Sequence, residues 1–137
     1  MRIESPNTKI TISSESDEIF VLGDSMRIHQ AIANLLANAR THTPARTKIV
    51  VKISHSDSDT RISISDNGPG LSEADQKRVF ERFFRADPSR VRVGGEGSGL
   101  GLAIVDAVMK AHGGSVEVQS KLGEGATFEI IFPQREL

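Results

Sequence analysis

The sequence predicts an α+β fold of two layers, in which a mixed sheet of about five strands is covered on one face by three helices. Two kinds of pattern carry this prediction. Several short segments alternate apolar and polar residues, as strands do, and three longer segments repeat apolar residues at helical spacing. The order is strand, strand, helix, hairpin, helix, long loop, helix, hairpin, which favours helices packed on one face of a sheet.

The first part of the chain is expected to form two strands and a helix. TKITISS (8–14) alternates strictly, and EIFVLGD (18–24) is a more continuous apolar run. The helix is expected from 26 to about 40, with Asp24 or Ser25 as its N-cap. Its apolar stripe consists of Ile28, Ile32, Leu35 and Ala39.

Two antiparallel hairpins are expected. In the first, KIVVKIS (48–54) and TRISISD (60–66) flank the polar turn HSDSD. In the second, SVEVQS (115–120) and ATFEIIFP (126–133) are joined through KLGEG. In both, a short polar or glycine-containing turn separates two alternating segments, which is the sequence pattern of a hairpin.

Two further helices are expected between the hairpins. SEADQKRVFERFF (72–84) opens with Ser72 as a cap and an acidic first turn. LGLAIVDAVMKAHGG (100–114) ends at Gly113, which suits a C-cap. The apolar stripe of this last helix consists of Leu100, Ile104, Ala107 and Ala111.

Length and composition limit the function. With 137 residues, we expect a single domain spanning 1–137, large enough for a core. The chain is 37% hydrophobic and 26% charged with a net charge of −1, which is ordinary for a soluble protein. The absence of cysteine excludes disulfides, thiolate catalysis and cysteine-based zinc sites. The start does not resemble a signal peptide and no apolar run could span a membrane, so we expect a soluble, cytosolic chain.

The segment GGEGSGLGLAI (94–104) has glycine at every second position from Gly95 to Gly101, immediately before the last helix. A helix start offers unpaired N–H groups and the positive end of a dipole, so this segment favours phosphate binding. It is not a P-loop, because Leu102 follows Gly101 where a lysine belongs. It is not a dinucleotide fingerprint either, because a leucine falls at the third glycine position. A flexible linker is the alternative interpretation of this segment alone.

Asn34 and Asn38 lie four residues apart on the first helix and therefore point the same way, beside the apolar stripe. Exposed surface asparagines are the ordinary interpretation. Near a glycine-rich site, however, an amide oxygen is a hard neutral ligand, suited to one position on a Mg²⁺ whose other ligands are phosphates and water.

The motif DNGPG (66–70) follows a strand that is expected to be buried. It is a turn sequence, but the hairpin already turns at 55–60, so Asp66 ends a strand instead. A carboxylate fixed there can accept a hydrogen bond from an exocyclic amine such as N6 of adenine, and such a bond is worth about 1.5–3 kcal/mol. Gly68 and Gly70 would let the backbone approach a flat ring closely.

About a dozen residues between FERFFRADPSR and the glycines have little expected structure. The arginines of this region are Arg82, Arg85, Arg90 and Arg92. A loop of that length in a compact domain is either disordered or a functional lid. A basic lid, at about 85–98, would suit a polyphosphate.

Five motifs in this order resemble the catalytic ATP-binding domain of sensor histidine kinases, in the GHKL ATPase superfamily. NLLANARTHTP resembles the N box, DNGPG the first glycine box and FERFFR the F box. GEGSGLGLAI resembles the second glycine box and GEGATFEIIFP the terminal one. The resemblance covers roughly residues 18–133 and implies the Bergerat-type ATP-binding fold.

The resemblance implies a set of residues around ATP and Mg²⁺. Asn38 would hold the metal, Asn34 would support the phosphates or the metal, and Arg85 would approach the distal phosphates; these three are the expected catalytic residues. Asp66 would bind adenine N6, with help from Thr127. The full expected ATP-binding set is Asn34, Asn38, His42, Asp66, Gly68, Gly70, Leu71, Arg85, Gly97, Ser98, Gly99, Leu100, Gly101, Leu102 and Thr127.

The resemblance also implies how the lid would be built. The amides of residues 97–102 would cradle the phosphates, and His42 keeps a position that in the family lies near the ribose and phosphates. Phe80 and Phe83 would support the lid and face the partner domain, although simple core packing explains one of them at least as well.

The chain departs from the family's usual pattern at one position. A Lys or Arg usually follows the second Asn by three residues, whereas Arg40 follows Asn38 by two. One residue turns a side chain by about 100° around a helix. The sequence therefore leaves open whether Arg40 reaches a phosphate.

The expected function is transfer of the γ-phosphoryl group of ATP to a histidine in two-component signalling. There are three alternatives. One is an anti-sigma-type serine kinase. The second is a self-contained ATPase, of which gyrase B, a mismatch-repair protein and a heat-shock chaperone are examples, and the third is a non-enzymatic nucleotide-binding module. The kinase and ATPase relatives place a glutamate four residues before the metal-binding Asn to activate a hydroxyl or water. Asn34 occupies that position here and cannot accept a proton.

None of the four histidines, His29, His42, His55 and His112, is followed by the acceptor pattern of the family. We interpret them as structural or site-lining. The expected partners are therefore the protein's own dimerisation and phosphoacceptor domain, which this sequence lacks, and a response regulator. We expect no nucleic-acid partner and no direct membrane contact from this domain, which would be the cytoplasmic part of a bacterial inner-membrane sensor.

Overall fold

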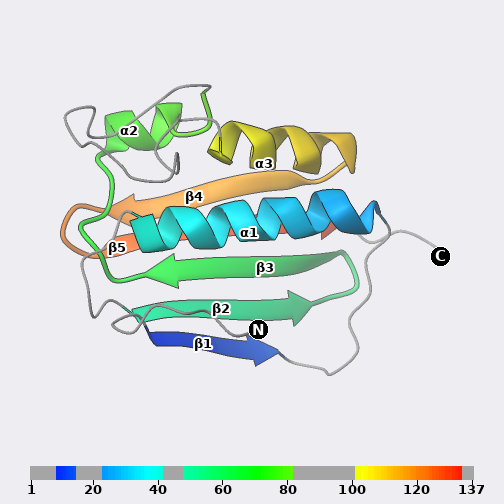
Figure 1. Cartoon of the computed structure of the whole chain (residues 1–137), viewed down its shortest axis with the longest axis horizontal. Helices are drawn as coiled ribbons and strands as arrows, with labels where there is room; N and C mark the ends of the chain where they lie inside the picture. The colour runs from blue at the N-terminus through cyan, green and yellow to red at the C-terminus, as the bar shows by residue number, and fades with distance from the viewer. Residues whose placement is uncertain (1–8, 15–22, 42–47, 82–100, 134–137) are drawn as a thin grey trace.

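A five-stranded sheet with helices on one face forms the part of the chain that the computed structural model describes, residues 9–14, 23–41, 48–81 and 101–133 (Figure 1). The α+β sandwich expected from the sequence is confirmed. The elements are, in chain order, β1 (Lys9–Ser14), α1 (Ser25–Thr41), β2 (Lys48–His55), β3 (Asp59–Asp66), α2 (Glu73–Arg78), α3 (Gly101–Ala111), β4 (Ser115–Lys121) and β5 (Gly125–Pro133).

The strands lie in the order β1-β2-β3-β5-β4. β1 runs parallel to β2, and the other three pairings are antiparallel, so the sheet is mixed as expected. Both predicted hairpins, β2–β3 and β4–β5, are present. The central pairing of β3 with β5 joins these two hairpins and places Asp66 opposite Ala126 at one end of the sheet.

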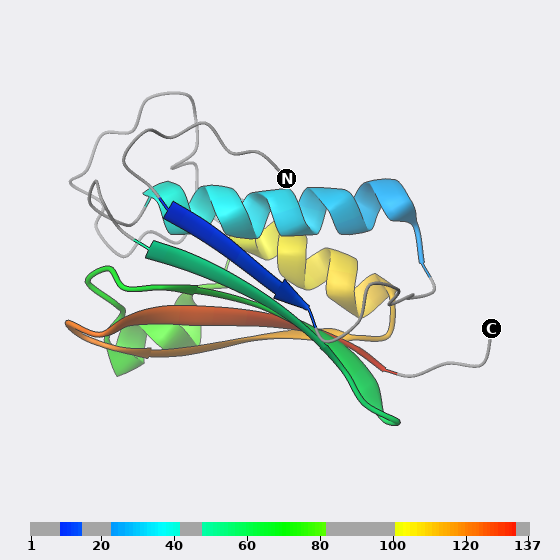
Figure 2. The same cartoon turned by 90° about the horizontal axis from the view of Figure 1, so that it is seen from below.

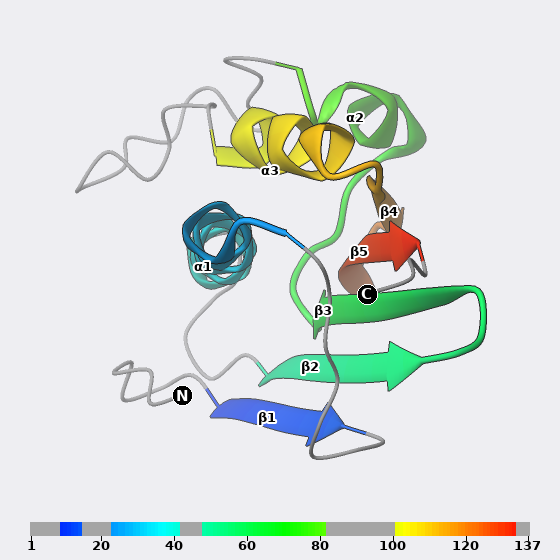
Figure 3. The same ribbon diagram turned by 90° about the vertical axis from the view of Figure 1, so that its right-hand side faces the viewer.

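The helices form the second layer. α1 and α3 lie on the same side of the twisted sheet (Figure 2), and α2 lies beside β4 at the sheet edge (Figure 3). The residues that follow α2 reach the same core, since Val79 is buried and the ring of Phe80 meets Phe128 edge to face at a centroid distance of 6.1 Å.

Alternation along the strands separates a core face from a polar face. On β3 and β5, Ile64, Phe128 and Ile130 are buried against the helices, whereas Ser65 and Thr127 lie on the other face. Burying each large apolar side chain contributes about 1.5–3 kcal/mol. The remaining core residues are Ala31, Leu35, Leu36 and Ala39 of α1, Ile49 and Val51 of β2, Val105, Val108 and Met109 of α3, and Val79, Ala126 and Phe132.

α1 begins where the sequence predicts. Asp24 is its N-cap, because the Oδ1 atom of Asp24 accepts hydrogen bonds from Met26 N at 3.0 Å and Arg27 N at 3.1 Å. The backbone N–H of Asp24 donates to Nε2 of His112 at 2.9 Å. Nε2 is therefore unprotonated, and Nδ1 carries the proton that it donates to Val108 O at 2.8 Å. His112 thus has a structural role, tying the end of α3 to the start of α1.

α3 ends at a Schellman motif built on Gly113, the expected C-cap glycine. Gly113 has a φ of 72°, which only glycine adopts without strain. Its N–H donates to Lys110 O at 3.1 Å, and Gly114 N donates to Met109 O at 2.8 Å.

Two expected elements differ from the structure in their extent. α2 ends at Arg78 rather than at residue 84, with Val79 as its C-cap, and residues 82–84 lie outside the described part of the chain. In the strand expected at 18–24, Gly23 and Asp24 are not strand, and the rest is outside the described residues.

The buried face of α3 also differs from the predicted stripe. The helix buries Val105, Val108 and Met109, whereas Ala107 and Ala111 are exposed. Apolar residues occur on more than one side of this helix, so spacing alone fits two faces, and the larger side chains face the sheet and α1.

Candidate functional site

Asp66 ends β3 at the edge of the core. Its Oδ1 atom accepts a hydrogen bond from Gly68 N at 2.9 Å, which fixes the carboxylate at the start of the DNGPG loop. Burial raises the pKa of Asp66, and hydrogen bonding to the Gly68 and Ala126 backbones partly offsets the rise. The carboxylate of Asp66 is therefore a hydrogen-bond acceptor that is fixed in position and partly desolvated, which suits the predicted adenine contact.

The glycines of this loop act differently from one another. Gly68 is buried and donates to Asp66. Gly70 has a φ of 75°, and a Cβ there would lie 2.2 Å from Lys121 O. The bare backbone of Gly70 therefore allows a close approach by the end of β4.

Gly125 makes the reciprocal approach from the β4–β5 turn. Its φ is 88°, and a Cβ there would lie 2.0 Å from the carbonyl oxygen of Asp66. The residue directly across from Asp66 is Ala126. The backbone of the loop after β3 and the backbone of the β4–β5 turn thus pack directly against each other at the end of the sheet.

Thr127 is one register step from Asp66. It pairs with Ser65, and the two hydroxyl oxygens are 2.8 Å apart. Because side chains alternate along β5, Thr127 projects from the face opposite the buried Ala126 and Phe128. The hydroxyl is thus engaged with Ser65 on the polar face, and Ala126, a residue that the sequence interpretation missed, occupies the position across from Asp66.

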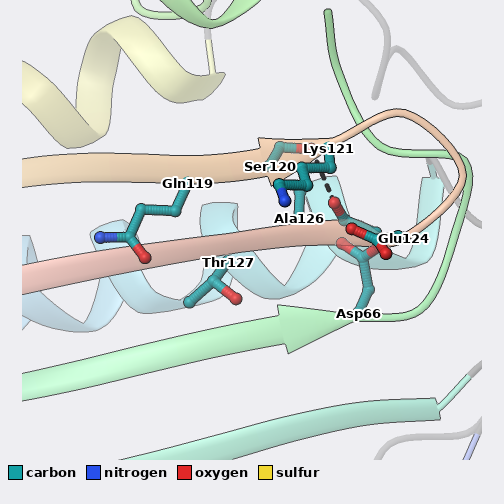
Figure 4. A pocket seen from close by; sticks show the side chains of 8 residues that line it. Asp66, Gln119, Ser120, Lys121, Glu124, Ala126 and Thr127 are labelled. Atoms are coloured by element: carbon teal, nitrogen blue, oxygen red, sulfur yellow. Dashed lines mark hydrogen bonds between the residues drawn. The ribbon is translucent and has the colours of Figure 1, made fainter.

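A polar hollow of about 300 Å³ lies beside Asp66 and Thr127. Figure 4 shows it with α1 behind the sheet, so the view is from the polar face. The hollow is lined by Asp66, Gln119, Ser120, Lys121, Glu124, Gly125, Ala126 and Thr127. It brings two of the predicted ATP-binding residues together, and neither asparagine of α1 lines it.

The two asparagines lie on one side of α1, both half-buried. The Nδ2 atom of Asn34 donates to the carbonyl oxygen of Gly101 at 3.3 Å, which links α1 to the first residue of α3. A Cβ on Gly101 would meet no described atom within 4 Å. Among the described residues, none therefore fills the space beside the start of α3, next to the amide of Asn34.

Three other predicted residues are part of the packing around the site. Leu71 and Leu102 are half-buried against the core, and Leu71 N donates to Ser120 Oγ at 2.7 Å. Phe80 packs on Phe128, so core packing explains this residue. His42, Phe83, Arg85, Gly97, Ser98, Gly99 and Leu100, together with the lid expected at 85–98, lie outside the described residues.

Two residues near Asp66 were missed by the sequence analysis. Ser120 and Gln76 make side-chain hydrogen bonds to the backbone of the loop after β3 and of the β4–β5 hairpin. The one signal in the sequence was Ser120 itself, a polar residue at the inward position that follows Val116 and Val118.

The family model for histidine kinase-, DNA gyrase B-, and HSP90-like ATPases matches residues 23–136. The chain belongs to this family of ATPases. Among its relatives, the probable sensor histidine kinase TcrY of Mycobacterium tuberculosis is 42% identical over 121 residues. The match covers 88% of this chain and 25% of TcrY, so the chain spans about a quarter of that relative.

Solved structures of histidine kinases share the fold of this ATPase chain. The mycobacterial sensor histidine kinase MprB matches with a TM-score of 0.79 and 31% identity, over 96% of this chain and 86% of that one. Full-length ShkA in complex with AMPPNP matches with a TM-score of 0.76 and 34% identity, over 92% of this chain and 25% of that one. The resemblance to the catalytic ATP-binding domain of histidine kinases is confirmed. None of the helices in the described residues is long and apolar enough to cross a membrane.

Proposed function

We propose that this chain binds ATP with Mg²⁺ and donates the γ-phosphoryl group to a histidine on a separate dimerisation domain of the same sensor kinase. In this proposal the chain is the cytoplasmic catalytic part of a bacterial inner-membrane sensor, and a response regulator then receives the phosphoryl group. The similarity to TcrY and MprB supports the histidine-kinase class within the family.

The observation that carries the proposal is the carboxylate of Asp66, which Gly68 N holds at the end of β3. Adenine carries an amine, N6, at the ring position where guanine carries a carbonyl oxygen. A fixed carboxylate is a strong acceptor for a hydrogen bond from this amine. ShkA, at 34% identity, is described in complex with AMPPNP, an ATP analogue, which supports ATP as the ligand.

The asparagines of α1 suit the metal and phosphate end of the same ligand. Asn38 would supply one amide oxygen to Mg²⁺, whose other ligands would be phosphates and water. When bound, Mg²⁺ would supply positive charge that offsets the negative charge developing on the phosphates during transfer. Asn34 would lie one helical turn away, where its bond to Gly101 O orients it toward the start of α3.

The isolated chain is expected to bind ATP without labelling itself or hydrolysing ATP appreciably. Asn34 stands where a carboxylate would activate water, and no histidine here has the acceptor pattern. Phosphoryl transfer depends mainly on positioning and charge stabilisation, so an acceptor that is not delivered in line receives nothing. Incubation with γ-labelled ATP, alone and with a separate domain bearing the acceptor histidine, tests this. We expect acid-labile, base-stable label on the added domain only.

Two other outcomes would overturn this assignment. Stable label on a serine would favour the serine-kinase alternative, and rapid turnover by the chain alone would favour a self-contained ATPase.

The affinity for ATP is expected to fall as the pH is lowered, and the fall should begin at a higher pH than the protonation of an ordinary aspartate would produce. Burial raises the pKa of Asp66, so its carboxylate takes up a proton at a higher pH and loses its strength as an acceptor for N6. Calorimetric titrations with ATP at a series of pH values measure this. A flat affinity over the range would remove Asp66 from adenine binding.

The contribution of Asp66 to folding stability depends on pH in the opposite direction to its contribution to ATP binding. Because the folded-state pKa is raised, its contribution to stability is present below the unfolded pKa and is lost as the pH rises through the raised value. The difference in unfolding free energy between the wild type and Asp66→Asn, followed against pH, isolates this contribution.

A further inference from the structure

The hydroxyl of Ser120 makes two short hydrogen bonds between segments that are distant in sequence. It accepts from Leu71 N at 2.7 Å and donates to Gly125 O at 2.6 Å. Leu71 ends the loop that begins at Asp66, and Gly125 begins β5 with its backbone against the Asp66 carbonyl. Ser120 therefore ties the end of this loop to the β4–β5 hairpin.

Gln76 of α2 supports the same junction from the other side. Its Nε2 atom donates to Leu71 O at 3.1 Å and to Ser120 O at 2.9 Å. The amide has two hydrogens, and both are used. Through this one side chain, α2, the loop after β3 and the end of β4 are held together.

The remainder of the loop is held by bonds to its neighbours. Asn67 Oδ1 accepts from Lys48 N at 2.9 Å, which ties the loop to the start of β2. Pro69 O accepts from Gly123 N at 2.7 Å, which ties it to the hairpin turn. The position of the Gly68 amide, and with it the Asp66 carboxylate, is therefore set by contacts on both sides of the loop.

We propose that Ser120 and Gln76 are positioning residues for adenine recognition by Asp66. Neither side chain contacts the nucleotide in this proposal; each acts through the backbone of residues 67–71. Loss of either one frees the end of the loop and lets the Asp66 carboxylate leave the geometry that suits N6. Binding groups need to be held to within about 0.5 Å, so a small shift lowers the selectivity for adenine. The inference rests on the proposed function.

The test compares ATP with inosine triphosphate, in which a carbonyl oxygen replaces the N6 amine. The wild type is expected to prefer ATP by about a hundredfold, because the Asp66 carboxylate would face an acceptor instead of a donor. Ser120→Ala and Gln76→Glu should each weaken ATP binding about tenfold and reduce the preference for ATP to about tenfold or less. Gln76→Glu keeps the shape of the side chain while removing both donors.

Two further variants separate positioning from a general loss of structure. Ser120→Thr keeps the hydroxyl and should retain the ATP preference. Thr60→Val removes a buried hydroxyl that lies 3.0 Å from His55 Nδ1 at the other end of β3, so it should change stability but not the preference. Amide exchange of Leu71 N should become faster in Ser120→Ala and stay slow in Thr60→Val.

The outcomes distinguish this inference from the proposed function. A wild type that binds neither nucleotide, or binds both equally, would overturn the proposed adenine site. A wild type that prefers ATP while folded Gln76→Glu and Ser120→Ala keep the same preference would overturn the positioning role alone. If Ser120→Ala does not fold, Gln76→Glu still decides the matter, because it removes two hydrogen bonds of the same junction independently of Ser120.

Discussion

Replacement of Asp66 by asparagine is expected to abolish ATP binding, with a loss of affinity of about a hundredfold or more, and to leave the fold intact. The carboxylate is a charge-assisted acceptor for adenine N6, whereas an amide can turn and present its NH₂ to the incoming amine. The fold should persist because an Asn oxygen can still accept from Gly68 N. Isothermal titration with ATP, together with thermal unfolding, measures both results.

Asp59→Asn is the matched control, since it makes the same change at the other end of β3. Asp59 pairs with Arg61 at 3.1 Å, and the hydrogen bond from Arg61 lowers the pKa of Asp59. Asp59 thus favours the fold above its unfolded pKa, and this contribution is lost as the pH falls. We therefore expect Asp59→Asn to reduce stability at neutral pH and leave ATP affinity unchanged. Near-normal affinity in Asp66→Asn would contradict the adenine assignment.

Gly125→Ala is expected to have the largest effect on stability, a loss of about 3 kcal/mol or more, which urea unfolding measures. The added Cβ would lie 2.0 Å from Asp66 O and 2.9 Å from the Asp66 carbonyl carbon, which are backbone atoms of the central β3–β5 pairing. Neither atom can move without disturbing the sheet. The φ of 88° adds the ordinary cost of a left-handed conformation.

Gly123→Ala separates these two causes. Gly123 has a similar φ of 81°, but a Cβ there would meet no described atom within 4 Å. Only the conformational cost of about 1–2 kcal/mol is expected for this variant. Equal losses in the two variants would mean that the close approach of Gly125 to β3 contributes nothing.

The hairpins and α1 were predictable because their signals are local. Strand alternation on both sides of a short turn defines each hairpin, and Asp24 precedes a clear apolar stripe. The buried face of α3 was not predictable in this way, because the helix is apolar on more than one side and its contacts with α1 and the sheet decide the orientation. The end of α2 was equally hidden, since Val79 and Phe80 continue the apolar pattern after the helix has stopped.

The site shows the same division. Asp66 could be found because it ends an alternating strand immediately before a glycine-rich loop. The face of Thr127 depends on the register of β5, and a slip of one residue exchanges it with Ala126. Gln76 could not be found from spacing, and Ser120 offered only a polar side chain at an inward strand position, because the partners of both are backbone atoms of segments that meet only in the folded chain.

The pairing of β3 with β5 has a consequence for how the protein unfolds. Each hairpin pairs residues that are close in sequence, whereas Asp66 meets Ala126 only when the two hairpins have joined. Pairings between distant segments form slowly, because the intervening chain must first be closed into a loop. Under the proposed function, the adenine contact exists only in the joined state. A ligand that binds this state alone stabilises it in proportion to the logarithm of its concentration. Bound nucleotide would thus stabilise the pairing of β3 with β5. The cellular ATP concentration would then set how often the two hairpins separate.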